Sequence, residues 1–83
     1  MLSLFFESEK DQESILSEAI KYFVDEVGLK VIQQDPYCVT FNGDGDKVGY
    51  VTVTLTQEGK KFQVKLETRE FEYWVKKFVR KFK

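Results

Sequence analysis

The chain has 83 residues, with 13 Lys and Arg against 14 Asp and Glu, and 42% of its residues are hydrophobic. It contains no histidine and a single cysteine, Cys38, which excludes histidine-based catalysis, histidine metal ligands and an internal disulfide. The apolar start, Leu2–Phe6, is too short for a secretion signal or a membrane span. We therefore expect a single cytoplasmic domain over residues 1–83, with no membrane contact.

The same start is too apolar to lie free in water, so residues 1–6 are expected either to add an edge strand or to pack in an interface. A helix is predicted from Glu9 to Val27. Ser8, with Asp11 three residues on, resembles a capping box, and Gly28 supplies the helix end. Apolar residues recur at the helical period along this segment: Leu16, Ala19, Ile20, Phe23, Val24 and Val27.

After Gly28 the hydrophobic period changes from that of a helix to that of a strand. Four short strands are predicted, in residues 29–33, 37–41, 49–56 and 61–67. Within 49–56 the apolar residues Val51, Val53 and Leu55 alternate with threonines, which indicates one buried and one open sheet face. Short connections between these strands favour an antiparallel meander.

The terminal segment predicts an amphipathic helix with Thr68 as its N-cap. Its apolar stripe is Phe71, Trp74, Val75, Phe78, Val79 and Phe82. Its other side is basic: Lys76, Lys77, Arg80, Lys81 and Lys83. The predicted fold is an α+β two-layer sandwich with a four-stranded antiparallel sheet and both helices on one face. The element order is α-β-β-β-β-α, with an extra N-terminal edge strand as the open alternative.

Net charge is unevenly distributed along the chain. Residues 1–46 hold ten acids and three lysines, whereas residues 47–83 hold ten bases and four glutamates. One interpretation is a basic surface that contacts nucleic acid or an acidic partner through Lys76, Lys77, Arg80, Lys81 and Lys83. The other is internal neutralisation, with acids of the first helix, such as Glu26, facing bases of the last.

The loop FNGDGDK places Asn42, Asp44 and Asp46 at alternating positions, as in the first half of an EF-hand loop. Lys47 and Val53 replace the glycine and the glutamate of that motif, so weak cation binding competes with a plain hairpin loop. Cys38 has no histidine or second cysteine near it in sequence, which favours a structural thiol. No catalytic residue or cofactor is predicted.

These features favour a non-enzymatic module for protein interaction or assembly. Its expected partner is another protein or a second copy of the chain, bound through an open sheet face, an edge strand or residues 1–6. The alternative is a nucleic-acid-binding domain that uses the basic face of the C-terminal helix.

Overall fold

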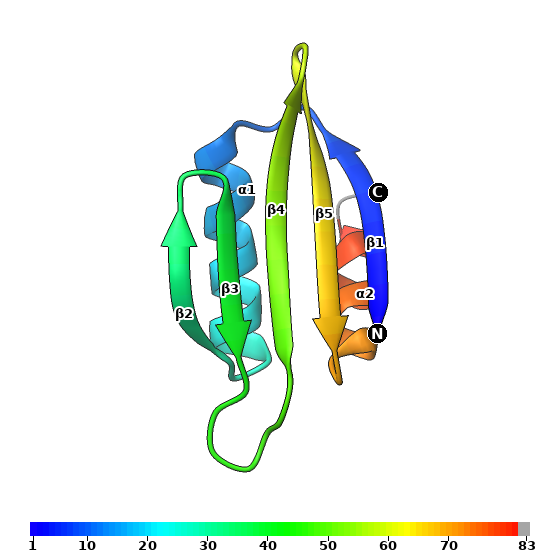
Figure 1. The fold of residues 1–83 in the computed structure, drawn as a ribbon. Coiled ribbons are helices and arrows are strands. Elements are labelled where there is room, and N and C mark those ends of the chain that lie inside the picture. The colour runs from blue at the N-terminus through cyan, green and yellow to red at the C-terminus, as the bar shows by residue number, and fades with distance from the viewer. Residues whose placement is uncertain (82–83) are drawn as a thin grey trace.

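The computed structural model describes residues 1–81 and has an α+β fold with a five-stranded antiparallel sheet (Figure 1). The strands are β1 (Leu2–Ser8), β2 (Lys30–Asp35), β3 (Cys38–Asn42), β4 (Tyr50–Glu58) and β5 (Lys61–Arg69). The helices are α1 (Gln12–Ile20), which continues as the π-helical segment η1 (Lys21–Glu26), and α2 (Glu72–Lys81). The strand order is β1-β5-β4-β3-β2, so β1 and β2 form opposite edges of the sheet.

The sheet has five strands rather than four because the apolar N-terminal segment pairs with β5. The register runs from Leu2 opposite Thr68 to Ser8 opposite Phe62. Phe6 is buried, and Leu2 and Leu4 pack against the core, which removes their apolar surface from water. The edge-strand alternative for residues 1–6 is therefore the one that the structure adopts.

The first helix is shorter than the predicted segment Glu9–Val27 and begins at Gln12. Ser8 ends β1, and the N-cap is Asp11, whose carboxylate accepts a hydrogen bond from the Ser14 backbone N–H at 2.7 Å. That hydrogen bond stabilises the ionised form and lowers the pKa of Asp11. The capping box predicted at Ser8 is thus absent, and the N-cap lies one turn later at Asp11, because Ser8 belongs to β1.

The end of η1 is held by a distant lysine. Gly28 has a φ of +86°, the left-handed conformation expected after a helix. The Lys47 ammonium donates to the Val27 carbonyl at 2.6 Å, and so places a cation at the negative end of the helix. This contact ties the loop between β3 and β4 to the end of the first helix.

The second helix begins at Glu72, so Thr68 is not its N-cap. Thr68 is a buried residue of β5, and its hydroxyl donates to the Tyr50 carbonyl at 2.8 Å. The predicted apolar stripe is confirmed within the described residues, since Phe71, Val75, Phe78 and Val79 are buried and Trp74 packs partly buried against the core. Phe82 and Lys83 lie outside the described residues.

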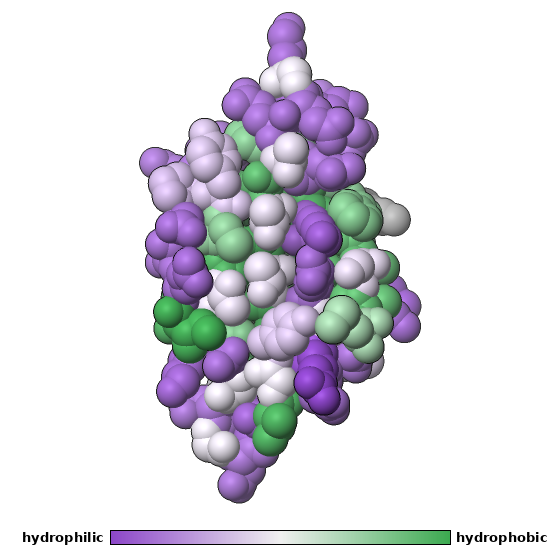
Figure 2. All heavy atoms as spheres, viewed as in Figure 1, coloured by the Kyte–Doolittle hydropathy of each residue, from purple (hydrophilic) through white to green (hydrophobic). Residues whose placement is uncertain are grey.

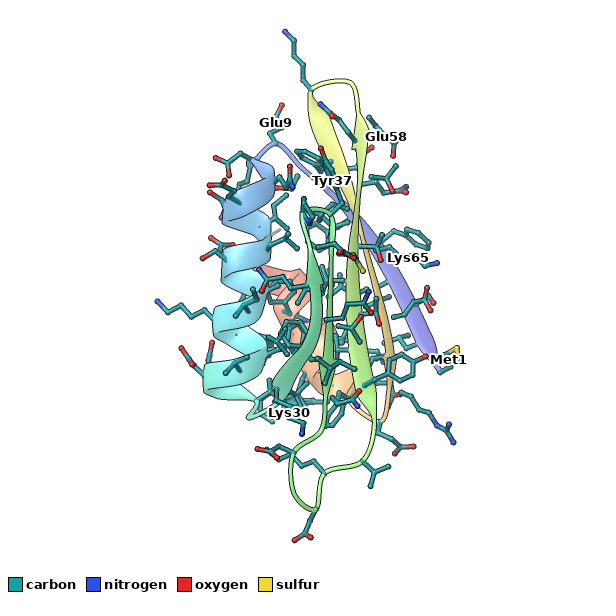
Figure 3. The ribbon with its side chains drawn as sticks, turned by 60° about the vertical axis from the view of Figure 1, so that its left-hand side comes forward. Met1, Glu9, Lys30, Tyr37, Glu58 and Lys65 are labelled. Carbon is teal, nitrogen blue, oxygen red and sulfur yellow. The ribbon has the colours of Figure 1, made fainter. Side chains whose placement is uncertain are left out.

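Both helices cover the same face of the sheet, behind the strands in Figure 1, and the first helix stands to one side of the sheet in Figure 3. A single core joins the two layers, with Phe23, Phe41 and Phe78 completely or almost completely buried at its centre. The other face carries the threonines of β3 and β4, and it is pale along its middle in Figure 2.

Candidate protein-interaction site

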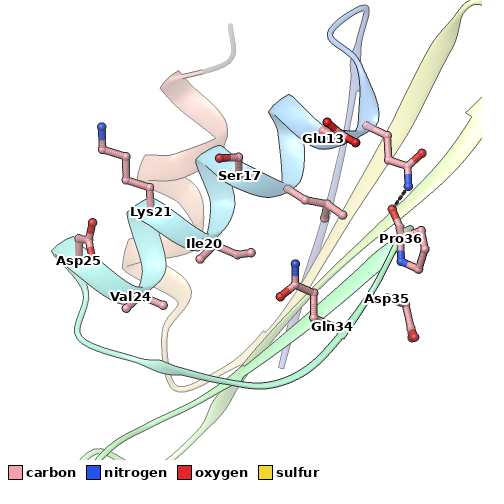
Figure 4. Close-up of a pocket in the computed structure, with 11 residues that line it drawn as sticks. Glu13, Ser17, Ile20, Lys21, Val24, Asp25, Gln34, Asp35 and Pro36 are labelled. Carbon is pink, nitrogen blue, oxygen red and sulfur yellow. Dashed lines mark hydrogen bonds between the residues drawn. The ribbon is translucent and has the colours of Figure 1, made fainter.

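A groove of about 820 Å³ separates the first helix from the edge strand β2 (Figure 4). Its lining comes from one side of α1 and η1 and from the end of the β2–β3 hairpin. These residues are Gln12, Glu13, Leu16, Ser17, Ile20, Lys21, Val24, Asp25, Gln34, Asp35 and Pro36. The groove lies here because α1 packs over β3 and β4, whereas β2 contacts the following segment η1 and keeps all six of its residues exposed.

The apolar part of this groove is a row of Leu16, Ile20 and Val24 at helical spacing. Leu16 is buried, whereas Ile20 and Val24 are only partly buried at the edge of the core. Part of the apolar stripe that the sequence predicted therefore faces the groove instead of the sheet.

One end of the groove is closed by a direct contact between the helix and the hairpin. The Gln12 side-chain amide donates to the Pro36 carbonyl, the dashed line in Figure 4. At the other end the chain itself connects η1 to β2, and the Leu29 N–H donates to the Phe23 carbonyl at 2.9 Å. The helix and the edge strand are thus held apart at a set spacing.

Strand β2 is the most exposed element of the sheet, since all six of its residues are exposed. The exposed fraction of the residue surface is 36% for Val31 and 50% for Ile32. The pairing with β3 shifts between Val31 and Gln33, which marks a bulge at Ile32. An edge strand also directs alternate backbone N–H and C=O groups outward without a partner strand.

The open sheet face is the second surface that the sequence singled out, and its side chains contact each other. Thr40 and Thr52 hydroxyl oxygens are 3.5 Å apart, and the Cys38 sulfur is 3.8 Å from the Thr54 hydroxyl. Lys65 forms an ion pair with Glu67 at 2.6 Å. Cys38 is a half-buried free thiol. Several polar side chains of this face are therefore paired with one another.

The basic residues of α2 divide into two groups. Lys76, Lys77 and Arg80 are exposed, and Lys77 lies over the Trp74 ring, 5.7 Å from its centroid. Lys81 forms an ion pair with Glu26 at 3.2 Å. Within residues 1–81 this is the only ion pair between the two helices, so internal neutralisation accounts for a small part of the charge asymmetry.

The three residues of the candidate cation loop are spread over its length. Asn42 ends β3 opposite Tyr50, whereas Asp44 and Asp46 lie in the exposed loop beyond it. The Lys47 N–H donates to the Asp44 carbonyl at 3.3 Å. Among the described residues, no three His, Cys, Asp or Glu side chains are grouped as a metal site requires. Cation binding by Asn42, Asp44 and Asp46 stays a prediction.

No helix within residues 1–81 has the length and apolar character needed to cross a membrane. Comparison of the chain with protein-family models, with curated proteins and with solved structures gave no match. The fold and the groove define a small α+β domain with an exposed edge strand beside an apolar cleft.

Sequence reasoning missed Gln12 and Gln34 as groove residues, and it assigned Leu16, Ile20 and Val24 entirely to the core. A signal was present in the segment KVIQQD, where Val31 and Ile32 are adjacent and break the alternation of a regular strand. Such a break is typical of a bulge, and bulges are common on edge strands.

Proposed function

We propose that this chain is a non-enzymatic protein-interaction module that receives an extended segment of a protein partner along β2. The observation that carries the proposal is the position of a fully exposed edge strand directly beside an apolar groove. Backbone groups at such an edge bind an added strand, and a neighbouring cleft receives its alternate side chains.

The dimensions of the groove agree with this mode of binding. The helical wall from Gln12 to Asp25 is about 20 Å long at 1.5 Å per residue. The six residues of β2 extend over about 20 Å at 3.3 Å per residue. An extended segment of similar length would therefore pair along β2 and place alternate side chains over Ile20 and Val24.

A peptide selection tests this proposal. Random peptides displayed on phage are selected on the immobilised full-length chain, and the most enriched peptide is synthesised and titrated into isotope-labelled protein. We expect chemical-shift changes in the amides of β2 and in the methyl groups of Leu16, Ile20 and Val24. An Ile20→Glu variant places a charge in the apolar row and should lose the binding.

The matched control is Val48→Glu, which introduces the same charge at a loop residue with 79% exposure. It should bind the peptide as the unmodified chain does. Selection that enriches no peptide, or peptides whose shift changes map to the open sheet face or to α2, would refute the proposal.

A second candidate function is nucleic-acid binding through α2, favoured by the exposure of Lys76, Lys77 and Arg80 on one side of the helix. Phosphate contacts release counterions, so such binding weakens steeply as salt rises. Binding of random-sequence DNA and RNA at low and high salt tests it, with Trp74 fluorescence as a reporter because Lys77 lies over its ring. No binding at low salt would exclude this candidate.

A further inference from the structure

We infer that the segment received by β2 is β2 of a second copy, so that two sheets join edge to edge about a two-fold axis. This inference rests on the proposed function and names its partner. It starts from the pairing positions of β2. The bulge at Ile32 leaves five residues of β2 paired with five consecutive residues of β3, from Asn42 back to Cys38. In chain order, these five residues of β2 are Lys30, Val31, Gln33, Gln34 and Asp35.

These five positions are symmetric about Gln33, the residue that follows the bulge at Ile32. Gln33 is the middle position, with Lys30 and Asp35 at the two ends. An antiparallel second copy centred on Gln33 therefore places Lys30 opposite Asp35 of the other chain, twice. Opposite charges directly across an antiparallel pair are favourable, and like charges are unfavourable. The end charges of β2 thus complement those of its own copy.

The sheet faces also agree in this register. Lys30 pairs with Asn42, and Asp35 pairs with Cys38, two residues of β3 on the open face. Val31 and Gln34 pair with Phe41 and Val39, whose side chains are buried on the helix face. Residues opposite one another must point to the same face, and this arrangement satisfies that condition at both pairs. Without the bulge, Lys30 and Asp35 would lie on different faces.

The other edge lacks this complementarity. The seven residues of β1 include one charged side chain, Glu7, so no antiparallel pairing of β1 with itself places opposite charges across the strands. The inward side chains of β1, such as Phe6, are already packed in the core. Strand β2 instead has exposed Val31 and Ile32 and an apolar groove that the second copy would cover.

Sedimentation equilibrium of the full chain at low salt tests the inference. We expect a concentration-dependent dimer. Lys30→Asp places two aspartates across each contact, and Asp35→Lys places two lysines across it. Each single variant should raise the dissociation constant roughly tenfold. An equimolar mixture of the two variants should dimerise at least as well as the unmodified chain, since every contact then joins an aspartate to a lysine.

Phe5→Lys is the control, because Phe5 is an exposed residue of the opposite edge and should leave the dissociation constant unchanged. A direct readout needs no variant: a mixture of labelled and unlabelled chains should give intermolecular proton contacts between Val31 and Gln34. A chain that stays monomeric at millimolar concentration overturns the inference, as does a dimer that Phe5→Lys disrupts. A monomer that still binds a selected peptide along β2 would refute this inference and retain the proposed function.

Discussion

Gly49 is a single residue on which the entry into β4 depends. Its φ is +132°, a backbone conformation that residues with a side chain rarely adopt. A Cβ atom at this position would lie 2.3 Å from the Arg69 carbonyl oxygen, closer than atoms in contact can come. Gly45, in the same loop, also has a positive φ of +66°, but a Cβ there meets no atom within 4 Å.

The two glycines give a matched pair of substitutions. Gly49→Ala should lower the free energy of unfolding by about 2–4 kcal/mol, because it adds a backbone clash to an unfavourable φ. Gly45→Ala should cost about 1 kcal/mol, since only the backbone conformation is unfavourable. Urea denaturation of both variants measures the difference. Equal losses would show that the close approach to Arg69 does not determine the stability of this loop.

At the scale of an element, β1 shows how alternation converts neighbouring residues into opposite roles. Phe6 has 7% exposure and joins the core, whereas Phe5 has 55% exposure on the open face. Phe5 is close to β5 there, with the Lys65 ammonium 5.9 Å from its ring centroid. Two identical side chains, adjacent in sequence, therefore differ mainly in the apolar area that folding buries.

Alanine substitution should separate the two phenylalanines. Phe6→Ala is expected to lower the free energy of unfolding by about 3–5 kcal/mol, as for other buried phenylalanines. Phe5→Ala should cost less than about 1 kcal/mol, because it leaves no cavity in the core. Denaturant unfolding followed by circular dichroism measures both. A larger loss for Phe5 would mean that the register of β1 on β5 is shifted by one residue.

At the scale of the whole molecule, the two helices and the sheet meet at a cluster of aromatic rings. The Phe23 ring lies 5.2 Å from those of Phe41 and Phe78, centroid to centroid. Tyr22 adds a polar link, since its hydroxyl donates to the Trp74 carbonyl at 3.1 Å. Burial, and then the nearby carboxylate of Glu26, raises the pKa of Tyr22.

This link predicts a loss of stability in alkali. The folded chain holds the Tyr22 proton more tightly than the unfolded chain does. The stability that the protonated Tyr22 hydroxyl contributes is therefore fully present below the pKa of the unfolded chain, near 10. It is lost as pH rises through the raised pKa of the folded chain. Tyr22→Phe should remove this part of the pH dependence and cost about 0.5–1.5 kcal/mol at neutral pH.

The matched control is Tyr37→Phe, at a tyrosine with 48% exposure in the turn between β2 and β3. Because Tyr37 is not among the groups that raise the pKa of Tyr22, the stability curve of this variant against pH should run parallel to that of the unmodified chain. If Tyr22→Phe and the unmodified chain lose the same stability between about pH 9 and 12, the burial of Tyr22 does not cause the loss in alkali.

Local patterns in the sequence predicted most of the fold. Alternation located β3, β4 and β5, because each of these strands has one face in the core and one outside. The helical period located much of the buried side of both helices, but it missed the buried Ile15 and Tyr22. The ends of elements were less predictable: Ser8 and Thr68 both resemble N-caps, yet each is used in a strand. A capping signal is only a few residues long, and a serine or threonine hydroxyl that could cap a helix can also form hydrogen bonds from within a strand.

The candidate site was decided by tertiary structure alone. The sequence by itself predicted that Leu16, Ile20 and Val24 form an apolar row and that residues 29–33 are extended. Only the tertiary structure placed α1 over β3 and β4 and η1 against β2, which left the residues of β2 exposed and opened the groove beside them. The physical reason is that periodicity reports which side of an element is apolar, whereas the neighbour that covers it depends on contacts distant in the chain.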